Sequence, residues 1–155
     1  MTPALWVANS SPLIVFQRIG RFTLLRDLVR RLHIPPMVRR EVFGTDPLPE
    51  WVEERMLTQP LASQIIAARI GPGEREAIAL ALEVKATWLI IDDLAGRRLA
   101  HSLGITVIGS VGLLLKAQAR GLIPAVRPLM EAMQREDFRI SERVFTAILA
   151  AAGEN

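Results

Sequence analysis

The segment Thr87–Ile91 constrains the fold more than any other part of the chain, because it is an unbroken apolar run that ends in two adjacent acids. A run of this length without alternating polar residues is typical of a strand covered on both faces, as in a parallel sheet. Apolar spacing after a Gly-Pro-Gly break predicts a helix over Glu74–Val84. After the run, a helix over about Leu94–Leu103 and a strand at Ile105–Ile108 are predicted. This alternation indicates an α/β fold with a mainly parallel sheet.

The rest of the chain extends the same pattern. Leu5–Ala8 is predicted to be a buried strand, and Asn9–Pro12 to open the helix that follows it. The remaining predicted elements are helices at about 13–18, 22–28, 37–43, 111–120, 124–135 and 141–152, a weak strand at 32–34 and an edge strand at 64–70. Residues 44–60, rich in Pro and Gly, are interpreted as a surface excursion. We therefore expect a single domain over residues 1–155, with helices on both faces of the sheet and the two C-terminal helices outside its core.

Composition excludes several classes of protein. Half of the residues are hydrophobic and 23% are charged, so a chain of 155 residues can bury a core. The absence of cysteine excludes disulfides, thiolate zinc sites and a cysteine nucleophile, and it fits a cytoplasmic location. No signal sequence or membrane span is expected, because the first Arg is Arg18 and the most apolar stretch, Ile105–Ala119, is too short. The net charge of +3 allows a polyanionic partner and is equally compatible with a role in solubility alone.

Polar residues follow two predicted strands at the edge where open parallel sheets bind their ligands. Asn9 and Ser10 follow the first strand, Asp92 and Asp93 follow the buried one, and Glu74 begins the preceding helix. Converging carboxylates repel one another and persist only with a compensating cation. Oxygen ligands select Mg²⁺ or Mn²⁺, and the chain has no Cys and only two His. The set therefore predicts one of these metals rather than zinc or copper.

Each candidate also has a structural interpretation. Asn9 and the serines can cap a turn, and Asp93 can be the N-cap of the next helix. Glu74, with Glu76, can favour a helix N-terminus through the dipole, and Glu41 can be a solvated helix charge. The adjacent acids after the buried strand are the strongest functional signal, because two like charges are crowded together there.

Other chemistries have weaker support. The turn Gly109–Gly112 lacks the P-loop lysine and the dinucleotide spacing, although its amides could meet a phosphate. His33 and His101 lie in segments without a nucleophile elbow. A hydrolytic triad is therefore not expected.

Several segments, taken in their order and spacing, resemble one known family. They are Val7–Ile14, Ile34-Pro35 leading to Glu41-Val42, Gly73–Ala81, Ile91–Asp93 with Arg97 and Ala100, and Gly109–Leu114. Together they are similar to the PIN-domain superfamily, most of all to its VapC-like bacterial and archaeal branch. The resemblance implies a Mg²⁺- or Mn²⁺-dependent endoribonuclease that hydrolyses RNA phosphodiester bonds. It also implies the toxin of a toxin–antitoxin pair, a homodimer, and inhibition by a small DNA-binding antitoxin.

The resemblance places the family's functional side chains on particular residues. The metal ligands that it implies are Asn9, Glu41, Glu74, Asp93 and, as a close neighbour, Asp92. The four carboxylates in this set are the implied catalytic residues. Ser10 matches the small hydroxyl residue beside the first acid, and the expected substrate contacts are Ser10, Arg97 and Lys116.

Asn9 departs from the family pattern, which has Asp at this position. An amide can bind a metal through its oxygen, but it brings no negative charge. One alternative hypothesis is therefore a catalytically weak PIN-like module that binds and regulates a partner protein or RNA, and another is a structural protein. The nuclease hypothesis depends on the convergence of Glu41, Glu74 and Asp93 in space.

Overall fold

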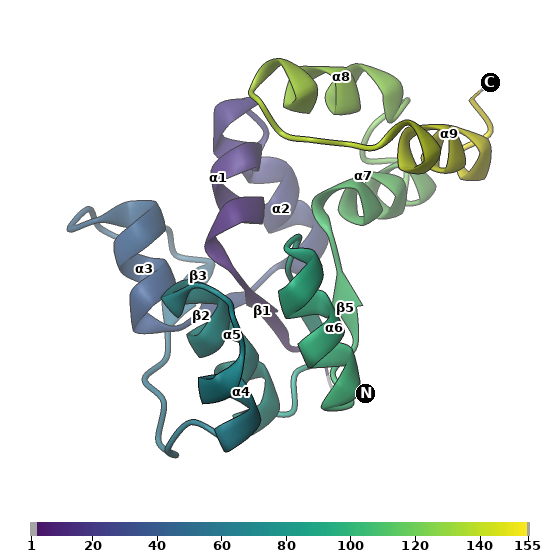
Figure 1. Ribbon diagram of the computed structural model, residues 1–155. Helices are drawn as coiled ribbons and strands as arrows, with labels where there is room; N and C mark the ends of the chain where they lie inside the picture. Colours follow the sequence, from purple (N-terminus) through teal and green to yellow (C-terminus); the bar gives the residue numbers. More distant parts are fainter. Residues whose placement is uncertain (1–2, 155) are drawn as a thin grey trace.

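The computed structural model describes residues 3–154, with a parallel five-stranded sheet at its centre (Figure 1). The strands are β1 (Trp6–Ala8), β2 (Leu32–Ile34), β3 (Val52–Glu54), β4 (Trp88–Ile90) and β5 (Val107–Ile108). Their order across the sheet is β3-β2-β1-β4-β5, and every neighbouring pair is parallel. The chain therefore moves from the central β1 to one edge and then continues on the other side of β1.

Helices connect the strands and cover the sheet. They are α1 (Ser10–Arg18), α2 (Phe22–Val29), α3 (Pro36–Phe43), α4 (Ser63–Ala67), α5 (Pro72–Glu83), α6 (Leu94–Ser102), α7 (Ser110–Ala119), α8 (Arg127–Arg135) and α9 (Glu142–Ala151). α5 packs on β1 and β4, and α3 packs on α1 and α5. All residues of β1 and β2 are buried, and successive residues of a strand point to opposite faces. Both faces of the sheet are therefore covered, and the predicted α/β fold is confirmed.

The edge strand predicted at 64–70 is wrong, because this part of the chain begins with the short helix α4. The strand was predicted because the segment is apolar. Instead, the N–H groups of Ile65 and Ile66 both donate to the carbonyl oxygen of Ala62, at 3.0 and 3.1 Å. Only one of the two is buried, since Ile65 is 1% exposed and Ile66 is 56% exposed. A single buried side chain suits one turn of helix packed on α5.

The segment 44–60 contains a strand that the sequence analysis missed. β3 pairs with β2 and forms the edge of the sheet. Its first residue, Val52, is buried, whereas Glu53 and Glu54 are exposed. Charged side chains are common on edge strands, where they discourage pairing with other chains. They also remove the apolar pattern by which a strand is found.

The two C-terminal helices pack on other helices, α8 on α1 and α9 on α7. α8 nevertheless belongs to the core more than predicted, because Met130 and Met133 are completely buried. In α9, all of whose residues are described, only Leu149 is buried. No helix within residues 3–154 is long and apolar enough to cross a membrane.

Candidate active site

The carboxyl ends of β1 and β4 lie side by side at the point where the strand order changes direction. Open α/β sheets form a ligand-binding crevice at such a switch point. Asn9 follows β1 directly, and its N–H donates to the carbonyl oxygen of Ile90 at 2.9 Å. Asp92 comes two residues after Ile90, at the end of β4. The topology therefore brings the two segments singled out in the sequence to one edge.

Asn9 is the most deeply buried polar residue of this edge apart from Ser110, with only 4% of its surface exposed. Its side chain does not cap α1, although it is the N-cap residue by position. Among the residues that the structure describes, none donates a hydrogen bond to its buried Oδ1. Leaving a buried acceptor unpaired costs about 1–3 kcal/mol. Capping of a turn therefore does not explain the buried side chain of Asn9, whereas a bound cation or hydrogen-bond donor would explain it.

Glu41 reaches Asn9 over the first turn of α5. Ser10 Oγ donates to Glu41 Oε1 at 2.5 Å. A Cβ atom placed on Gly73 would collide with Glu41 Oε1 and would lie 3.4 Å from Asn9 Oδ1. Both oxygens thus approach the same point of the helix backbone, where glycine leaves room for them. Glu41 is accordingly held within the site, and it is more than a solvated helix charge.

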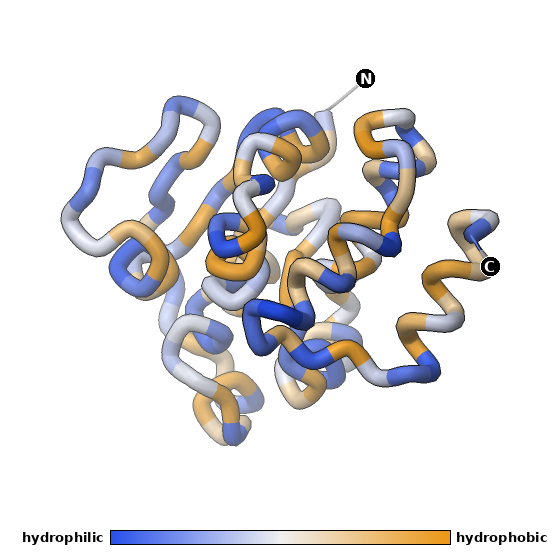
Figure 2. Tube along the Cα trace, turned by 90° about the horizontal axis from the view of Figure 1, so that it is seen from above, coloured by the Kyte–Doolittle hydropathy of each residue, from blue (hydrophilic) through white to orange (hydrophobic). Residues whose placement is uncertain are grey.

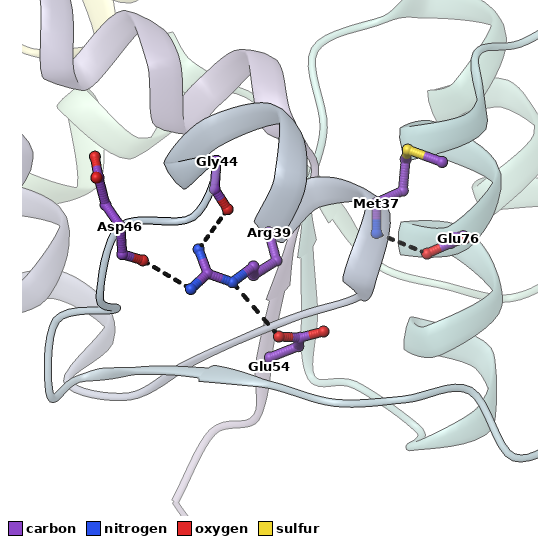
Figure 3. A network of polar contacts seen from close by, with 6 residues as sticks. All are labelled: Met37, Arg39, Gly44, Asp46, Glu54 and Glu76. Atoms are coloured by element: carbon purple, nitrogen blue, oxygen red, sulfur yellow. Dashed lines mark hydrogen bonds and ion pairs between the residues drawn. The ribbon is translucent and has the colours of Figure 1, made fainter.

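Two sets of contacts fix α3, and with it Glu41 (Figure 3). At its N-terminus, the N–H of Met37 donates to Glu76 Oε1 of α5 at 2.9 Å. Beyond its C-terminus, Arg39 donates to the carbonyl oxygens of Gly44 and Asp46 at 3.0 and 2.7 Å. The same guanidinium lies 3.6 Å from a carboxylate oxygen of Glu54 in β3. The sequence analysis assigned Glu76 a helix-dipole role; the structure adds that it holds α3 against α5.

Asp92 is held by a partner that the sequence analysis did not assign. The N–H of Ser110 donates to Asp92 Oδ1 at 2.8 Å, and Ser110 Oγ donates to Asp92 Oδ2 at 2.6 Å. Burial raises the pKa of Asp92, while these hydrogen bonds and the charge of Arg97 oppose the rise. The signal in the sequence was a serine two residues after the end of β5, the strand beside β4. The Ser110 amide, one of those that could have met a phosphate, instead donates its hydrogen bond to Asp92.

The remaining candidates are Asp93 and the two basic residues expected to contact the substrate, Arg97 and Lys116. Asp93 is exposed, and its Oδ2 accepts from the N–H of Gly96 at 2.8 Å, so it caps α6. Arg97 donates to the carbonyl oxygen of Ile91 at 3.2 Å. Lys116 Nζ instead lies 4.8 Å from the ring centroid of Trp88, at the start of β4. Lys116 therefore does not join the other candidates.

A cleft of about 1030 Å³ opens beside these residues. Its acidic wall is lined by Asn9, Glu74, Asp92, Asp93 and Arg97. A Cβ on Gly71 would lie 2.5 Å from Glu74 Oε2, so the Glu74 side chain folds back over the helix start. A second part of the lining comes from the C-terminal part of the chain.

This fold and this site agree with the comparison to known families. A family model described as a PIN domain matches residues 5–154. The chain belongs to the PIN-domain family. No curated protein matches its sequence significantly. PIN domains are typically nucleases and generally use divalent metals. The predicted resemblance to this superfamily is confirmed.

A divalent metal in this PIN domain would need several oxygen ligands that converge on one point. Within residues 3–154, no three Asp, Glu or His side chains lie close enough together to form a metal-binding group. The predicted three-carboxylate set is therefore not assembled in this structure, because Ser10 holds Glu41 and the start of α6 holds Asp93. The donor chemistry still fits a hard cation. Asn9, whose Oδ1 is buried and unpaired, lines one cleft with Glu74 and Asp92, and oxygen is the ligand atom that Mg²⁺ and Mn²⁺ prefer.

Proposed function

We propose that this PIN domain is a Mg²⁺- or Mn²⁺-dependent endoribonuclease that hydrolyses RNA phosphodiester bonds. The observation that supports this most is the buried, unpaired Oδ1 of Asn9 in a cleft with Glu74 and Asp92. A buried acceptor without a partner, beside a cleft that carboxylates also line, is stabilised by a cation or a strong donor. Family membership supports the nuclease class.

The roles of the side chains follow from their contacts. Asn9, Glu74 and Asp92 would hold the metal, with Glu41 beside Asn9, and Asp93 would join them if it released α6. A bound divalent cation would neutralise phosphate charge and lower the pKa of the attacking water. Ser110 orients Asp92, and Ser10 orients Glu41. Arg97 would bind the substrate phosphate, for which its planar guanidinium is suited.

The test is cleavage of single-stranded RNA by purified protein with and without Mn²⁺. We expect Mn²⁺-dependent cleavage by the wild type and none by the double variant Glu74→Gln, Asp92→Asn. Isothermal titration with Mn²⁺ alone should show binding that the double variant loses. Cleavage that persists in the double variant would indicate a contaminating nuclease or another site.

A second candidate function is a catalytically weak module that binds and regulates RNA or a partner protein. Asn9 favours it, because the site has one negative charge fewer than the family pattern. If this candidate is correct, Asn9→Asp should create or greatly raise Mn²⁺-dependent cleavage. If the wild type is already a competent nuclease, the same change should have little effect.

The biological role that we propose is the toxin of a toxin–antitoxin pair. It would act in the cytoplasm as a homodimer and be inhibited by a small DNA-binding antitoxin. Induced expression should then arrest growth, whereas Asp92→Asn should not. Co-expression of a small protein encoded next to this gene should relieve the arrest; growth unaffected by the wild type would rule the role out.

A further inference from the structure

The C-terminal part of the chain adds an apolar wall to the lining of the cleft. It is lined by Phe138 and Ile140 of the linker between α8 and α9 (residues 136–141), and by Val144 and Ile148 of α9. Figure 1 shows the linker crossing from α8 to α9 beside α7, and Figure 2 shows hydrophobic positions along α9. A hydrated metal ion or a phosphate gains little from an apolar surface. The flat face of a nucleobase, by contrast, stacks on such a surface.

Phe138 is fixed in place by the end of α8. The N–H of Phe138 donates to the carbonyl oxygen of Met133 at 3.1 Å, and the N–H of Asp137 donates to that of Gln134 at 3.1 Å. Asp137 has a positive φ of 63°. These bonds form a Schellman motif, which ends a helix in one defined geometry. At the other end of the linker, Ser141 Oγ accepts from the N–H of Val144 at 3.1 Å and caps α9. The linker thus presents the ring of Phe138 from a defined backbone.

The charges around the cleft suit a nucleic-acid backbone. Arg97 lies on the acidic wall and Arg139 next to Phe138 on the apolar wall. A Cβ on Gly109 would lie 2.7 Å from Arg97 Nη1 and 2.9 Å from Asp92 Oδ1, so this guanidinium is already beside the acid. The volume, about 1030 Å³, is at the upper end for small-ligand clefts and exceeds the need of a metal alone.

We propose that the apolar wall is a nucleobase-binding subsite in which Phe138 stacks on an unpaired base of the substrate, while Arg139 binds the adjoining phosphate. The proposal rests on the proposed ribonuclease function and makes Phe138 a specificity-determining residue. A base in a duplex is stacked on its neighbours, so the subsite selects single strands. A protein segment is a less suitable occupant, because the cleft continues into the acidic site and contains two arginines.

The experiment is binding of a short fluorescein-labelled single-stranded RNA, measured by fluorescence anisotropy in EDTA so that no cleavage occurs. The comparison probe is the same ribose-phosphate chain without bases. We expect the wild type to prefer the base-containing probe about tenfold. Phe138→Ala should abolish the preference, and Phe138→Trp should keep it. Arg139→Gln should weaken binding of both probes, because both have phosphates.

Phe145→Ala is the matched control, since Phe145 lies on α9 under Arg127 and does not line the cleft. It should retain the base preference. Equal affinity of the wild type for both probes, or a preference that survives Phe138→Ala, would overturn the proposal. A change in oligomeric mass on Phe138→Ala with unchanged RNA binding would also overturn the proposal. It would show that the apolar wall contacts a second copy of the chain. Base-dependent binding without Mn²⁺-dependent cleavage would reject the nuclease function and leave the subsite standing.

Discussion

The two walls of the cleft are built in different ways. The acidic wall extends from β1 and β4, in each of which the last two residues are completely buried. Its Asp92 is held by Ser110 of α7. The apolar wall belongs to a linker and to α9, which buries one residue. Segments with few buried contacts open more easily than the core. The proposed chemistry would thus be placed by the sheet, and the proposed substrate contacts by a part of the molecule that can change more freely.

A few contacts hold the apolar wall to the rest of the molecule. Glu154 Oε2 accepts from the N–H of Val126 at 2.8 Å, and its Oε1 accepts from the N–H of Arg127 at 3.2 Å, at the start of α8. The Arg127 guanidinium lies 5.5 Å from the ring centroid of Phe145. These contacts join both ends of the α8–α9 unit. Perturbing one wall at a time can therefore separate catalysis from substrate binding.

The largest effect is expected on the acidic wall, from Asp92→Asn. Loss of a metal-binding carboxylate removes several kcal/mol of transition-state stabilisation, so the cleavage rate should fall on the order of a thousandfold. Asp93→Asn is the matched change: asparagine also caps helices, so α6 should persist and the rate should change much less. Single-turnover cleavage of one RNA measures both. An equal loss in the two variants would show that Asp93 leaves α6 and acts in the site.

The next largest effect is expected from Gly73→Ala. The new Cβ would displace the flexible end of Glu41 from Asn9, while alanine is the better helix former. Cleavage should therefore fall on the order of ten- to a hundredfold, as for other perturbed metal surroundings, with little change in melting temperature. Gly71→Ala is informative beside it, because its Cβ would meet Glu74 instead. Unchanged cleavage in Gly73→Ala would remove Glu41 from the site.

These two experiments also mark the limit of the sequence analysis. The apolar run before Asp92 and the order of the motifs were enough to predict the α/β fold and the edge of the sheet where acids gather. They could not predict which of two adjacent acids turns inward. That choice depends on Ser110 after the neighbouring strand β5, which holds Asp92, and on the N–H of Gly96, which holds Asp93.

The apolar wall was not predicted as part of a site for a related reason. Phe138 and Ile140 lie in a linker without periodicity, and their proximity to Asn9 arises only when α8 and α9 fold back over the sheet edge. β3 was missed because Glu53 and Glu54 hide its single buried residue. Local patterns thus identify apolar strands well, and identify charged edge strands and long-range walls poorly.

A smaller effect should come from Glu154→Ala on the apolar wall. Loss of the hydrogen bonds to the start of α8 should cost about 1 kcal/mol of stability. A loosened wall should raise KM severalfold and leave kcat unchanged, because substrate contacts are weakened and the acids are not. Glu83→Ala is the control: Glu83 accepts from the N–H groups of Thr58 and Gln59 in the same manner, but away from the cleft. A higher KM in both variants would show that the effect comes from a general loss of stability and not from the apolar wall.

The smallest effect concerns the sheet, through His33 in β2. Burial lowers the pKa of His33 below its ordinary 6.5 in the folded protein, although the nearby Glu53 partly offsets this. The unfolded chain then binds the proton more tightly, so stability is lost as the pH falls from about 6.5 toward the lower pKa of the folded state. His33→Gln, which cannot titrate, should flatten the unfolding free energy over this range in urea titrations. Because His33 does not line the cleft, base-dependent RNA binding should be the same in both proteins. A variant that keeps the full acid sensitivity would assign the pH dependence to other groups.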